Sequence, residues 1–592
     1  MADGNRTFLL VPAAGAGEGM GHLVRSMKLA AALGPRVSFL TTRMDSAARA
    51  LLAEELRHFP RHPRPVVLEK LPSQGRWDIL LVDARRTTRE ELSALMPHGL
   101  VVCMDEGGEA RRYAPFLVDA IPGLPGTSPA NLTSPAFLDL PARRKKPVRL
   151  PPRRVLLSFG GEDRQGLSRK LVEALLREEL FAPQDLTIVE GPLFAPAGWP
   201  PGVAVAKGAS GLARGLGEND LLFSHFGITV FEALAAGVPV ITFNPSAYHE
   251  RLAAAAGVPS IGTLRPDMQA LRQLMGDAQR LRAVVEGFNG ELGRERGRRM
   301  CALLLGLHAR GTQACPICGR QGNPVVGRFS ERTYRRCPRC SITHMQSFAP
   351  EPKRYGKEYF SSEYRRQYGR TYLEDFDAIK AASRPRVQVI NGLLRSDQEG
   401  VVVDIGCAYG PFLDAAREAG MPCYGVDVSP EAVEHVRRKL RIPALCSSFE
   451  KLEPRALPRR IAAITLWYVL EHFTDPDLTL RKASSLLPPG GVFAFSTPNG
   501  RGISARRGMR QFLRHSPADH FTIFSPRGLR KLLEAYGLDL RRIRVTGHHP
   551  ERFPGLLGRT AVRSPAAYTV LRGISRLMSL GDTFEAYAVK GK

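Results

Sequence analysis

The sequence predicts an α/β protein in which three Rossmann-like βα domains and one small cysteine module follow one another along the chain. Strand-like apolar runs alternate with amphipathic helical stretches from residue 7 to about 300, and the alternation starts again near residue 400. A glycine-rich turn follows the leading strand of each series. Two Cys-x-x-Cys pairs lie between the second and third series. At about 150 residues per domain, a chain of 592 residues has room for about four such units.

Composition and charge exclude several classes of protein. No apolar run approaches the roughly 20 residues that cross a bilayer, and no basic stretch precedes a long apolar one at the N-terminus, so we expect no signal peptide. Nine cysteines in 592 residues argue against a disulfide framework and predict a cytoplasmic protein. The net charge of +27 is typical of an arginine-rich, well-solvated surface, and it leaves attraction to phosphates, anionic sugars or an anionic membrane open.

The first domain, expected over residues 1–150, carries a glycine turn between its first strand and its first helix. In the stretch GEGMGHLVRSMKLA, Gly19 and Gly21 let the backbone approach a ligand, and free amides at the helix start favour an anion. His22 stands where a general acid or base would face a cleft, and Arg25 follows one turn later. A plain glycine turn with a capping histidine is the alternative interpretation.

The second domain, expected over residues 151–310, repeats the order of strand, small-residue turn and helix. SFGGEDRQG begins at Ser158, and SHFGITVFEALAAGVPVITF begins at Ser224. A carboxylate one turn into the second of these helices can take two ribose hydroxyls while the helix amides hold a diphosphate. The candidate ligand-binding residues of this domain are Gly160, Gly161, Gly227, Thr229 and Glu232.

These stretches resemble the two-domain nucleotide-sugar hydrolases and glycosyltransferases, above all the UDP-sugar hydrolase group of flagellin-sugar and spore-coat polysaccharide synthesis. That family's G-x-G-H-x-x-R-x-x-x-L-A element is complete from Gly19 to Ala30, whereas Phe226 replaces the first glycine of its G-G-x-T-x-x-E-A element. The resemblance implies two Rossmann-like domains of glycosyltransferase-B type, with UDP on the second domain and His22 activating water or an acceptor. Hydrolysis, glycosyl transfer and binding without catalysis all remain open.

The cysteine module is expected over residues 311–345. Cys315 and Cys318 form one Cys-x-x-Cys pair, and Cys337 and Cys340 form the other. This spacing is typical of a small four-cysteine zinc ribbon, and four protein ligands leave no open position, so we predict a structural zinc ion. The basic runs of the chain do not interleave aromatic residues as a single-strand binding groove does, which argues against nucleic acid as the partner.

A helical connector is expected over residues 346–395, and the third βα domain over residues 396–545. The stretch VVVDIGCAYG has the form D-x-G-x-x-x-G, with Asp404, Gly406 and Gly410 around a turn after a buried strand. Asp427 ends the next strand, where an acid can bind the ribose hydroxyls of an adenosyl cofactor. The spacing differs from that of a dinucleotide turn because a sulfonium nucleoside has no pyrophosphate to hold.

This domain resembles the class I S-adenosylmethionine-dependent methyltransferases. The resemblance implies that the two glycines frame the methionine moiety, that Asp427 takes the ribose, and that Phe449 or Glu450 lies near adenine. His472, after the fourth strand, and His520, in ADHFTIFSP, are candidate bases for an acceptor hydroxyl, and a role in shaping the pocket is equally open. A Rossmann-like domain without methyl transfer is the alternative.

The ribbon, a tyrosine-rich segment at 354–373 and the third domain together resemble zinc-ribbon methyltransferases of sugar and surface-polysaccharide biosynthesis. We therefore predict a bifunctional cytoplasmic enzyme with S-adenosylmethionine and zinc as cofactors. Its C-terminal half would methylate a sugar or glycan intermediate, and its N-terminal half would hydrolyse or transfer a UDP-type nucleotide sugar. The alternatives are an RNA-modifying methyltransferase and a methyltransferase with a noncatalytic nucleotide-sugar module. Residues 546–592 are expected to form a weakly patterned tail.

Overall fold

The computed structural model divides the chain into two compact units, Met1–Leu307 (unit 1) and His308–Lys592 (unit 2). The structure describes all residues except 1–5, 61–62, 125–127, 145–148, 150, 192–193, 195–197, 208–214, 295–298, 350–363, 366–368, 396–397 and 592. Much of the predicted tyrosine-rich segment therefore lies outside the described residues. Within the described residues, no helix has the length and hydropathy that a membrane span requires.

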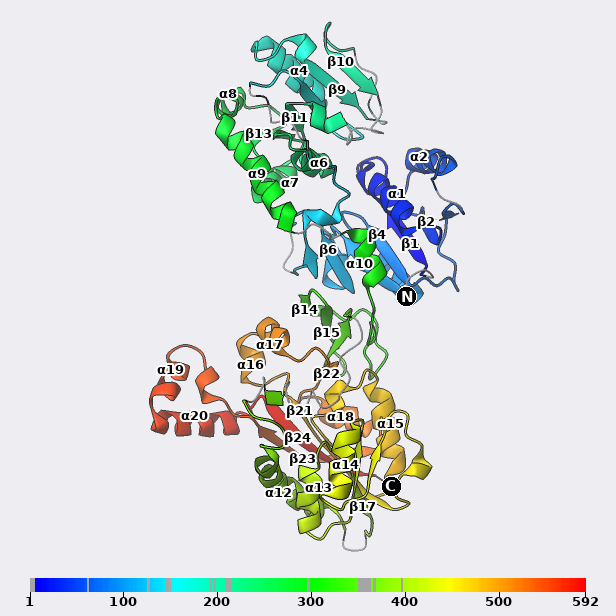
Figure 1. Cartoon of the computed structure of the whole chain (residues 1–592), viewed down its shortest axis with the longest axis vertical. Helices are drawn as coiled ribbons and strands as arrows, with labels where there is room; N and C mark the ends of the chain where they lie inside the picture. The colour runs from blue at the N-terminus through cyan, green and yellow to red at the C-terminus, as the bar shows by residue number, and fades with distance from the viewer. Residues whose placement is uncertain are drawn as a thin grey trace. The chain divides into compact units, whose positions relative to one another are not determined.

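Unit 1 contains two parallel sheets (Figure 1). The first has the strand order β3-β2-β1-β4-β5-β6-β7. Its strands are β1 (Phe8–Pro12), β2 (Val37–Leu40), β3 (Val66–Leu68), β4 (Ile79–Asp83), β5 (Leu100–Met104), β6 (Phe116–Asp119) and β7 (Leu132–Thr133). The connecting helices are α1 (Gly21–Leu33), α2 (Ser46–Arg57) and α3 (Arg89–Leu95). The strands β1, β4 and β5 are buried along their whole length, as continuous apolar runs are in parallel sheets covered on both faces.

The second sheet of unit 1 has the order β10-β9-β8-β11-β12-β13 and is also parallel. Its strands are β8 (Val155–Ser158), β9 (Leu186–Glu190), β10 (Ala204–Lys207), β11 (Leu221–Ser224), β12 (Val240–Asn244) and β13 (Ser260–Thr263). Its helices are α4 (Leu167–Arg177), α6 (Ile228–Ala236), α7 (Ala247–Ala255), α8 (Met268–Gly276) and α9 (Ala278–Arg294). The helix α6 ends at Gly237, whose φ of +85° closes the last turn in the left-handed region.

The last helix of unit 1, α10 (Met300–Gly306), returns to the first sheet. The Arg6 guanidinium, just before β1, donates to the carbonyl oxygens of Leu304 at 3.1 Å and Leu307 at 2.7 Å. The two parallel sheets confirm the α/β class that the alternating pattern predicts for this half of the chain.

Unit 2 is built on a seven-stranded sheet with the order β19-β18-β17-β20-β21-β24-β23, in which β24 is antiparallel to both neighbours. The strands are β17 (Val401–Ile405), β18 (Cys423–Asp427), β19 (Ala444–Cys446), β20 (Ile461–Trp467), β21 (Val492–Pro498), β23 (Leu538–Thr546) and β24 (Thr583–Lys590). The helices α12 (Phe376–Leu393) and α13 (Pro411–Glu418) pack on one face, and α15 (Pro476–Leu486) and α18 (Leu529–Glu534) on the other. Three other helices precede β23: α14 (Pro430–Arg438), α16 (Ile503–Arg507) and α17 (Met509–His515).

The cysteine module forms a four-stranded antiparallel sheet, β14-β15-β16-β22. The strands β14 (Val325–Phe329), β15 (Arg332–Arg336) and β16 (Thr343–Ser347) come from the module itself. The fourth strand, β22 (Thr522–Ile523), comes from the third domain and pairs with Thr343 and His344 of β16. The module and the third domain therefore share one sheet, and Cys315 and Cys337 pack in the same hydrophobic core as β20 and β21.

Residues 546–592 differ from the weakly patterned tail that the sequence suggests. Their last strand, β24, lies between β21 and β23, inside the main sheet. Along β24, Phe584, Ala586 and Ala588 belong to the core beneath α15 and α18, while Tyr587 belongs to the core beneath α12. Both faces of the strand are covered, and its buried Glu585 is paired with Arg386 at 2.8 Å, which explains how a charge can stand inside an internal strand.

Between β23 and β24 the chain forms two helices, α19 (Leu556–Arg563) and α20 (Pro565–Leu577), and we call residues 556–578 the helical hairpin. Seven of its large apolar side chains are exposed: Leu556, Leu557, Val562, Val570, Ile574, Leu577 and Met578. Four arginines are exposed beside them: Arg559, Arg563, Arg572 and Arg576. No Asp or Glu occurs between residues 553 and 581. The hairpin therefore offers water a surface that is both apolar and positively charged.

Candidate active sites

The turn after β17 places the D-x-G-x-x-x-G residues of the third domain. Gly406 and Gly410 have φ angles of +70° and +83°, in the left-handed region. A Cβ atom on Gly406 would overlap the side chain of Val469, and one on Gly410 would lie 2.8 Å from Cδ1 of Leu440. Only glycine meets both the backbone angle and the available space at these two positions.

Asp427 joins the ends of β17 and β18. Its Oδ2 accepts a hydrogen bond from the backbone N–H of Ala408 at 2.8 Å, and its Oδ1 accepts one from the N–H of Ser429 at 2.8 Å. Burial raises the pKa of Asp427, while the N–H donors of Ser429 and Ala408 oppose the shift. Each carboxylate oxygen has a second lone pair, so the side chain can also accept hydrogen bonds from ligand hydroxyls.

Asp404 supports the turn from below. It is buried, and the Thr465 hydroxyl donates to its Oδ1 at 2.6 Å, which links β17 to β20. Burial raises the pKa of Asp404 to about 7; the Thr465 hydrogen bond and Arg386 act against this shift, and Asp427 adds to it. The carboxyl group is therefore near its titration midpoint at neutral pH.

The two residues expected near adenine lie in different surroundings. Phe449 is 2% exposed and belongs to the core, with the Lys482 ammonium 5.2 Å from its ring centroid. Glu450 is exposed to water. Next to them the Ser448 hydroxyl is buried and has no hydrogen-bond partner in the described part of the chain. Ser448 is thus a further polar group for this edge of the site, which sequence reasoning missed.

A tyrosine from the connector reaches the same turn. The Tyr372 ring lies 5.1 Å from that of Tyr364 and 6.0 Å from that of Tyr409. Burial raises the pKa of Tyr372 well above its usual value, and the charges of Asp404 and Asp427 add to the effect. The described part of the tyrosine-rich segment therefore forms one wall beside the two acids of the third domain.

The candidate bases His472 and His520 come together from distant segments. His472 ends the short helix η9 (Leu470–His472) after β20, and His520 precedes β22. Their ring centroids are 4.7 Å apart, and Nδ1 of His472 lies 3.2 Å from Oδ2 of Asp519. Burial lowers the pKa of His472, but Asp519 and Glu471 outweigh it and raise the pKa overall. Burial, followed by the neighbouring His472, lowers the pKa of His520 to about 3.

Glu471, which sequence reasoning missed, completes this cluster. Its side chain is fully buried, and among the described residues neither carboxylate oxygen has a hydrogen-bond partner of normal geometry. Burial raises its pKa to about 7, with His472 and the nearby Thr497 hydroxyl acting in the opposite direction. The ligand atoms of Glu471, His472 and His520 all lie within 4.8 Å of one another.

All four predicted cysteines converge. Their sulfur atoms lie within 4.8 Å of one another, and those of Cys318 and Cys337 are 3.7 Å apart. Zn–S bonds of about 2.3 Å in a tetrahedron place sulfurs about 3.8 Å apart. The two pairs close similar turns, since the backbone N–H of Gly319 donates to the carbonyl oxygen of Cys315 and that of Ser341 to the carbonyl oxygen of Cys337, each at 2.9 Å. The cluster is therefore compatible with one tetrahedral ion.

Unit 1 has a cleft of about 1800 Å³ lined by residues of both its sheets. All nine residues expected to act on or bind a nucleotide sugar line this cleft: Gly19, Gly21, His22, Arg25, Gly160, Gly161, Gly227, Thr229 and Glu232. The carboxyl ends of parallel strands meet at one edge of a sheet, so turns far apart in sequence come to face the same space.

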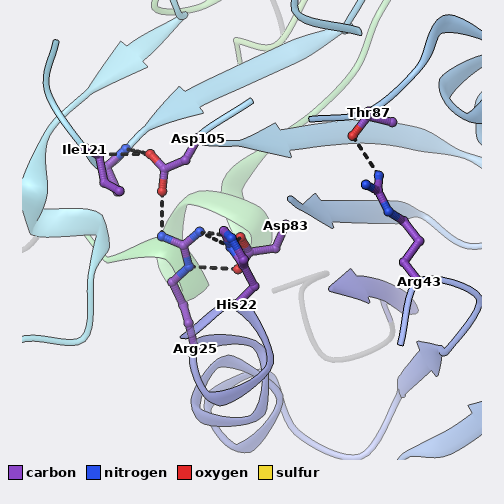
Figure 2. Close-up of polar contacts among 8 residues, drawn as sticks. His22, Arg25, Arg43, Asp83, Thr87, Asp105 and Ile121 are labelled. Carbon is purple, nitrogen blue, oxygen red and sulfur yellow. Dashed lines mark hydrogen bonds and ion pairs between the residues drawn. The ribbon is translucent and has the colours of Figure 1, made fainter. Parts of the chain in front are cut away.

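His22 and Arg25 are held by two buried acids (Figure 2). The Nδ1 atom of His22 lies 2.7 Å from Oδ1 of Asp83, at the end of β4. Arg25 donates through Nε to Oδ2 of Asp83 at 2.7 Å and through Nη1 to Oδ2 of Asp105 at 2.6 Å. Asp105 in turn accepts from the backbone N–H of Ile121 at 2.9 Å. With Nδ1 engaged, Nε2 is the histidine nitrogen left for chemistry in the cleft.

The charges of this network stabilise one another. Burial alone would raise the pKa of Asp83, but Arg25 and His22 outweigh it and lower the pKa to about 2. Burial likewise opposes the charge of Arg25, yet Asp83 and Asp105 raise the pKa of that guanidinium above its ordinary value. Asp83 therefore stays ionised and keeps His22 in one orientation.

The second domain's side of the cleft contains Phe226, which replaces the first glycine of the G-G-x-T-x-x-E-A element. Phe226 points into the core, where its ring meets Phe231 edge-on with centroids 5.6 Å apart. Its backbone N–H already donates a hydrogen bond to Oδ1 of Asn244, at 2.9 Å. Glu232 lies 3.4 Å from the Lys28 ammonium of α1, and burial raises the pKa of Glu232 while Lys28 opposes the shift.

Sequence reasoning missed several residues that line the cleft or hold its lining residues in place. Asp83 ends β4 and contacts His22, and Asp105 follows β5 and lines the cleft. An acid at the end of a predicted parallel strand is the signal that could have found them. His225, Tyr248 and His249 also line the cleft, with the His225 and His249 rings 5.8 Å apart. Burial, followed by His225 and Arg85, lowers the pKa of His249 to about 4.

Residues 378–543 match the family model described as "Methyltransferase domain". A ubiquinone biosynthesis O-methyltransferase from Bordetella avium (strain 197N) is 31% identical over 134 residues, which are 21% of this chain and 54% of that protein. The protein of the same name from Colwellia psychrerythraea (strain 34H / ATCC BAA-681) is 25% identical over 201 residues, which are 30% of this chain and 82% of that protein. The chain thus spans about half the length of the first of these relatives.

Among solved structures, one similar structure is that of magnesium protoporphyrin IX methyltransferase from Synechocystis PCC 6803 with bound SAH. The match includes 40% of this chain and 98% of the chain of that protein. The sequence identity is 15% and the TM-score is 0.28. The sequence matches, rather than this likeness, identify the domain. Residues 378–543 match a methyltransferase domain, and the C-terminal half of the chain is similar in sequence to methyltransferases.

Proposed function

We propose that the C-terminal half transfers a methyl group from S-adenosylmethionine to a hydroxyl of a sugar or glycan intermediate. The observation that carries methyl transfer is the glycine turn locked to Asp427 through Ala408, inside a segment that matches a methyltransferase family. S-adenosylmethionine supplies an electrophilic methyl group when bound. Around it, Gly406 and Gly410 leave room for the methionine moiety, and Asp427 accepts hydrogen bonds from the ribose.

On the acceptor side, the proposal assigns proton removal to the histidine pair. Asp519 holds Nδ1 of His472, and the His520 ring lies beside it. A base placed this way takes the acceptor proton as the oxygen–methyl bond forms and the sulfur–methyl bond breaks. Transfer to oxygen is supported by the similar proteins, which are named O-methyltransferases. A sugar acceptor is supported by the nine cleft-lining residues of unit 1.

For unit 1 we propose hydrolysis or glycosyl transfer of a UDP-type nucleotide sugar, on two lobes of glycosyltransferase-B type. Asp83 orients His22 as an acid orients a catalytic histidine, and Nε2 can take a proton from water or from an acceptor. Glu232 would accept hydrogen bonds from the ribose hydroxyls once its ion pair with Lys28 opens. Added acceptor separates the two reactions, because only glycosyl transfer depends on it.

For the four-cysteine cluster we propose a structural zinc ion. Cys315, Cys318, Cys337 and Cys340 would hold it, and their spacing matches the ion's preferred geometry. The metal would stabilise a module whose own three strands are too few for an independent core, and β22 adds the fourth.

We further propose that the helical hairpin rests on an anionic membrane surface. Its seven exposed apolar side chains would enter the boundary of the lipid, and its four arginines would meet the headgroups. A stretch without acidic residues is complementary in charge to such a surface. The methyltransferase half would then work close to lipid-linked glycans.

The central test incubates the full chain with labelled S-adenosylmethionine, a panel of nucleotide sugars and glycans, and bulk RNA. Label in a sugar product is expected, whereas label in RNA alone would replace this proposal with the RNA-modifying alternative. His22→Ala should abolish turnover of the nucleotide sugar and leave methyl transfer intact. His58→Ala, at an exposed position of the same cleft, is the matched control. Unchanged turnover in His22→Ala would make unit 1 a binding module.

A further inference from the structure

We propose that a pocket between the end of β23 and the helix α20 binds a phosphate group. The pocket has a volume of about 690 Å³, which is within the range of ordinary ligand sites. Ten residues line it, and none of the ten is acidic. We call it the basic pocket, because its lining includes Arg544, His548, Arg572 and Arg576.

The positive charge of the basic pocket is only partly balanced by the protein. Arg572 and Arg576 lie one turn apart on α20, and no ion pair with either guanidinium occurs among the described residues. Nη1 of Arg544 lies 3.2 Å from Oε2 of Glu585, but the same carboxylate already pairs with Arg386. Guanidinium groups bind phosphate through two parallel hydrogen bonds, so a phosphate group suits this set of donors.

His548 fixes α20 against the end of β23. Its Nε2 lies 3.1 Å from the carbonyl oxygen of Val545, and its Nδ1 lies 2.8 Å from the hydroxyl oxygen of Ser575. A carbonyl oxygen only accepts, so Nε2 carries a proton and the neutral ring accepts the Ser575 hydroxyl through Nδ1. Ser575 is buried and stands between Arg572 and Arg576 in the sequence. The histidine is therefore a positioning residue that holds the helix with both arginines lining the pocket.

The pKa of His548 reflects the excess of positive charge. Burial lowers this pKa, and the hydrogen bond to the Val545 carbonyl opposes the shift. The charges of Arg576 and Arg572 then lower the pKa further. A bound phosphate would balance these charges and would raise the pKa of His548.

The strand directions place the basic pocket at the edge of the sheet that carries the proposed methyl-transfer site. β24 is antiparallel to both β21 and β23, so the carboxyl ends of β21 and β23 lie at one edge. Asp427 ends β18 and His472 follows β20 at that same edge. Three strand spacings separate β23 from β20, which is roughly 14 Å at about 4.8 Å per spacing.

This position indicates what the phosphate would belong to. A sugar acceptor that carries a phosphate or diphosphate would keep its anion in the basic pocket while a hydroxyl reaches the methyl group. The headgroup of an anionic lipid under the helical hairpin would supply the same chemical group. The acceptor as the source rests on the proposed methyl transfer, but the phosphate site itself does not.

Arginine modification tests the site in the wild-type full chain. We would treat the protein with phenylglyoxal and follow each modified peptide by mass spectrometry. Pyrophosphate at about ten times its Kd should slow the modification of Arg572 and Arg576 about 10-fold, because the free fraction falls as 1 + [L]/Kd. Arg559 and Arg563 are the internal controls, since they are exposed on α19 and do not line the pocket. Equal protection of all four arginines, or no saturable protection, overturns the inference.

Vesicles containing phosphatidylglycerol, without pyrophosphate, test the lipid headgroup as the source. Selective protection of Arg572 and Arg576 by pyrophosphate assigns the site to a free phosphate or diphosphate. Selective protection by the vesicles alone assigns it to the headgroup. Vesicles that protect all four arginines, with no effect of pyrophosphate, would leave a membrane contact of the hairpin and remove the phosphate site.

A second measurement counts the bound anions. Unit 1 is proposed to hold a diphosphate as well, so the comparison is between variants in equilibrium dialysis with labelled pyrophosphate. Arg572→Gln with Arg576→Gln should bind one pyrophosphate fewer per chain than the wild type. Arg559→Gln with Arg563→Gln removes the same charge and should bind as many as the wild type. Equal numbers in the wild type and the first double variant overturn the inference.

Calorimetry with S-adenosylmethionine keeps this result apart from the proposed function. Cofactor binding without a pyrophosphate in the basic pocket leaves methyl transfer standing and removes the phosphate site. Pyrophosphate in the basic pocket without cofactor binding does the opposite.

Discussion

Asp83→Asn is the sharpest test of the buried network in unit 1. The substitution keeps the shape of the side chain and leaves Arg25 with Asp105 as its remaining acid. Removing one partner of a buried ion pair costs about 3–5 kcal/mol. The pKa of Asp83, lowered from 3.8 to about 2, gives a second measure, since a shift of roughly two units corresponds to about 2.5 kcal/mol. We therefore expect a loss of about 3 kcal/mol.

The sign of the pH dependence follows from the lowered pKa. The ionised form is favoured in the folded state, so this stabilisation is complete above pH 3.8 and disappears as the pH falls toward 2. At pH 7 the full loss should appear in Asp83→Asn. Near pH 3 the variant and the wild type should be closer in stability, because the carboxylate of the unfolded wild type, with its ordinary pKa of 3.8, is then mostly protonated.

Hydrogen exchange followed by mass spectrometry measures the loss locally. Peptides covering β4 and β5 should exchange about 150-fold faster in the variant, since each 1.4 kcal/mol is a factor of ten. Peptides covering β20 in unit 2 provide the internal control. The reasoning is refuted if β4 and β5 exchange at the wild-type rate, or if β20 accelerates equally.

Three further predictions concern unit 2. Because burial raises the pKa of Asp404 to about 7, the folded state binds an extra proton between pH 4 and 7 and loses stability as the pH rises through that range. Asp404→Asn should therefore be more stable than wild type at pH 8, by roughly 4 kcal/mol at most, and the difference in stability should be smaller at pH 5. Hydrogen exchange of the β17 amides at the two pH values measures this difference. An equal difference in stability at pH 5 and pH 8 would contradict the prediction. Cys337→Ser should lose the zinc measured by elemental analysis and expose β14–β16 to protease, and retention of one zinc per chain would argue against the four-cysteine site. Leu556→Glu with Leu577→Glu should abolish sedimentation with vesicles containing phosphatidylglycerol, while wild type should bind these and not phosphatidylcholine vesicles; binding by the double variant would remove the hairpin from the proposal.

The parts of both sites that sequence could predict are those encoded in local patterns. Gly406 and Gly410 are recognisable because a left-handed turn after a strand requires glycine. The cysteines are recognisable because two-residue spacing brings two thiolates to one ion. Such signals need no knowledge of the distant chain.

The parts that could not be predicted depend on contacts between distant segments. Asp83 meets His22 across 61 residues, and neither residue's neighbours reveal the pairing. In the sequence Glu471 is an ordinary acid beside a histidine. Its burial depends on β22, a strand from a distant part of the chain, and so could not be predicted. The strand β24 could not be predicted for two reasons. Its partner β23 lies 36 residues earlier in the sequence, and the buried Glu585 interrupts the apolar pattern of the strand.

The position of β24 has a consequence for synthesis and truncation. Since β23 is bonded to the sheet only through β24 among the described strands, residues 538–546 must wait for residues 583–590 to leave the ribosome before they can join. Until then β21 presents an open edge with unpaired backbone groups, which attracts other chains. A protein cut within the helical hairpin would keep its glycine turns and histidines and still be prone to aggregate, so truncated fragments of unit 2 should be recovered mainly from inclusion bodies.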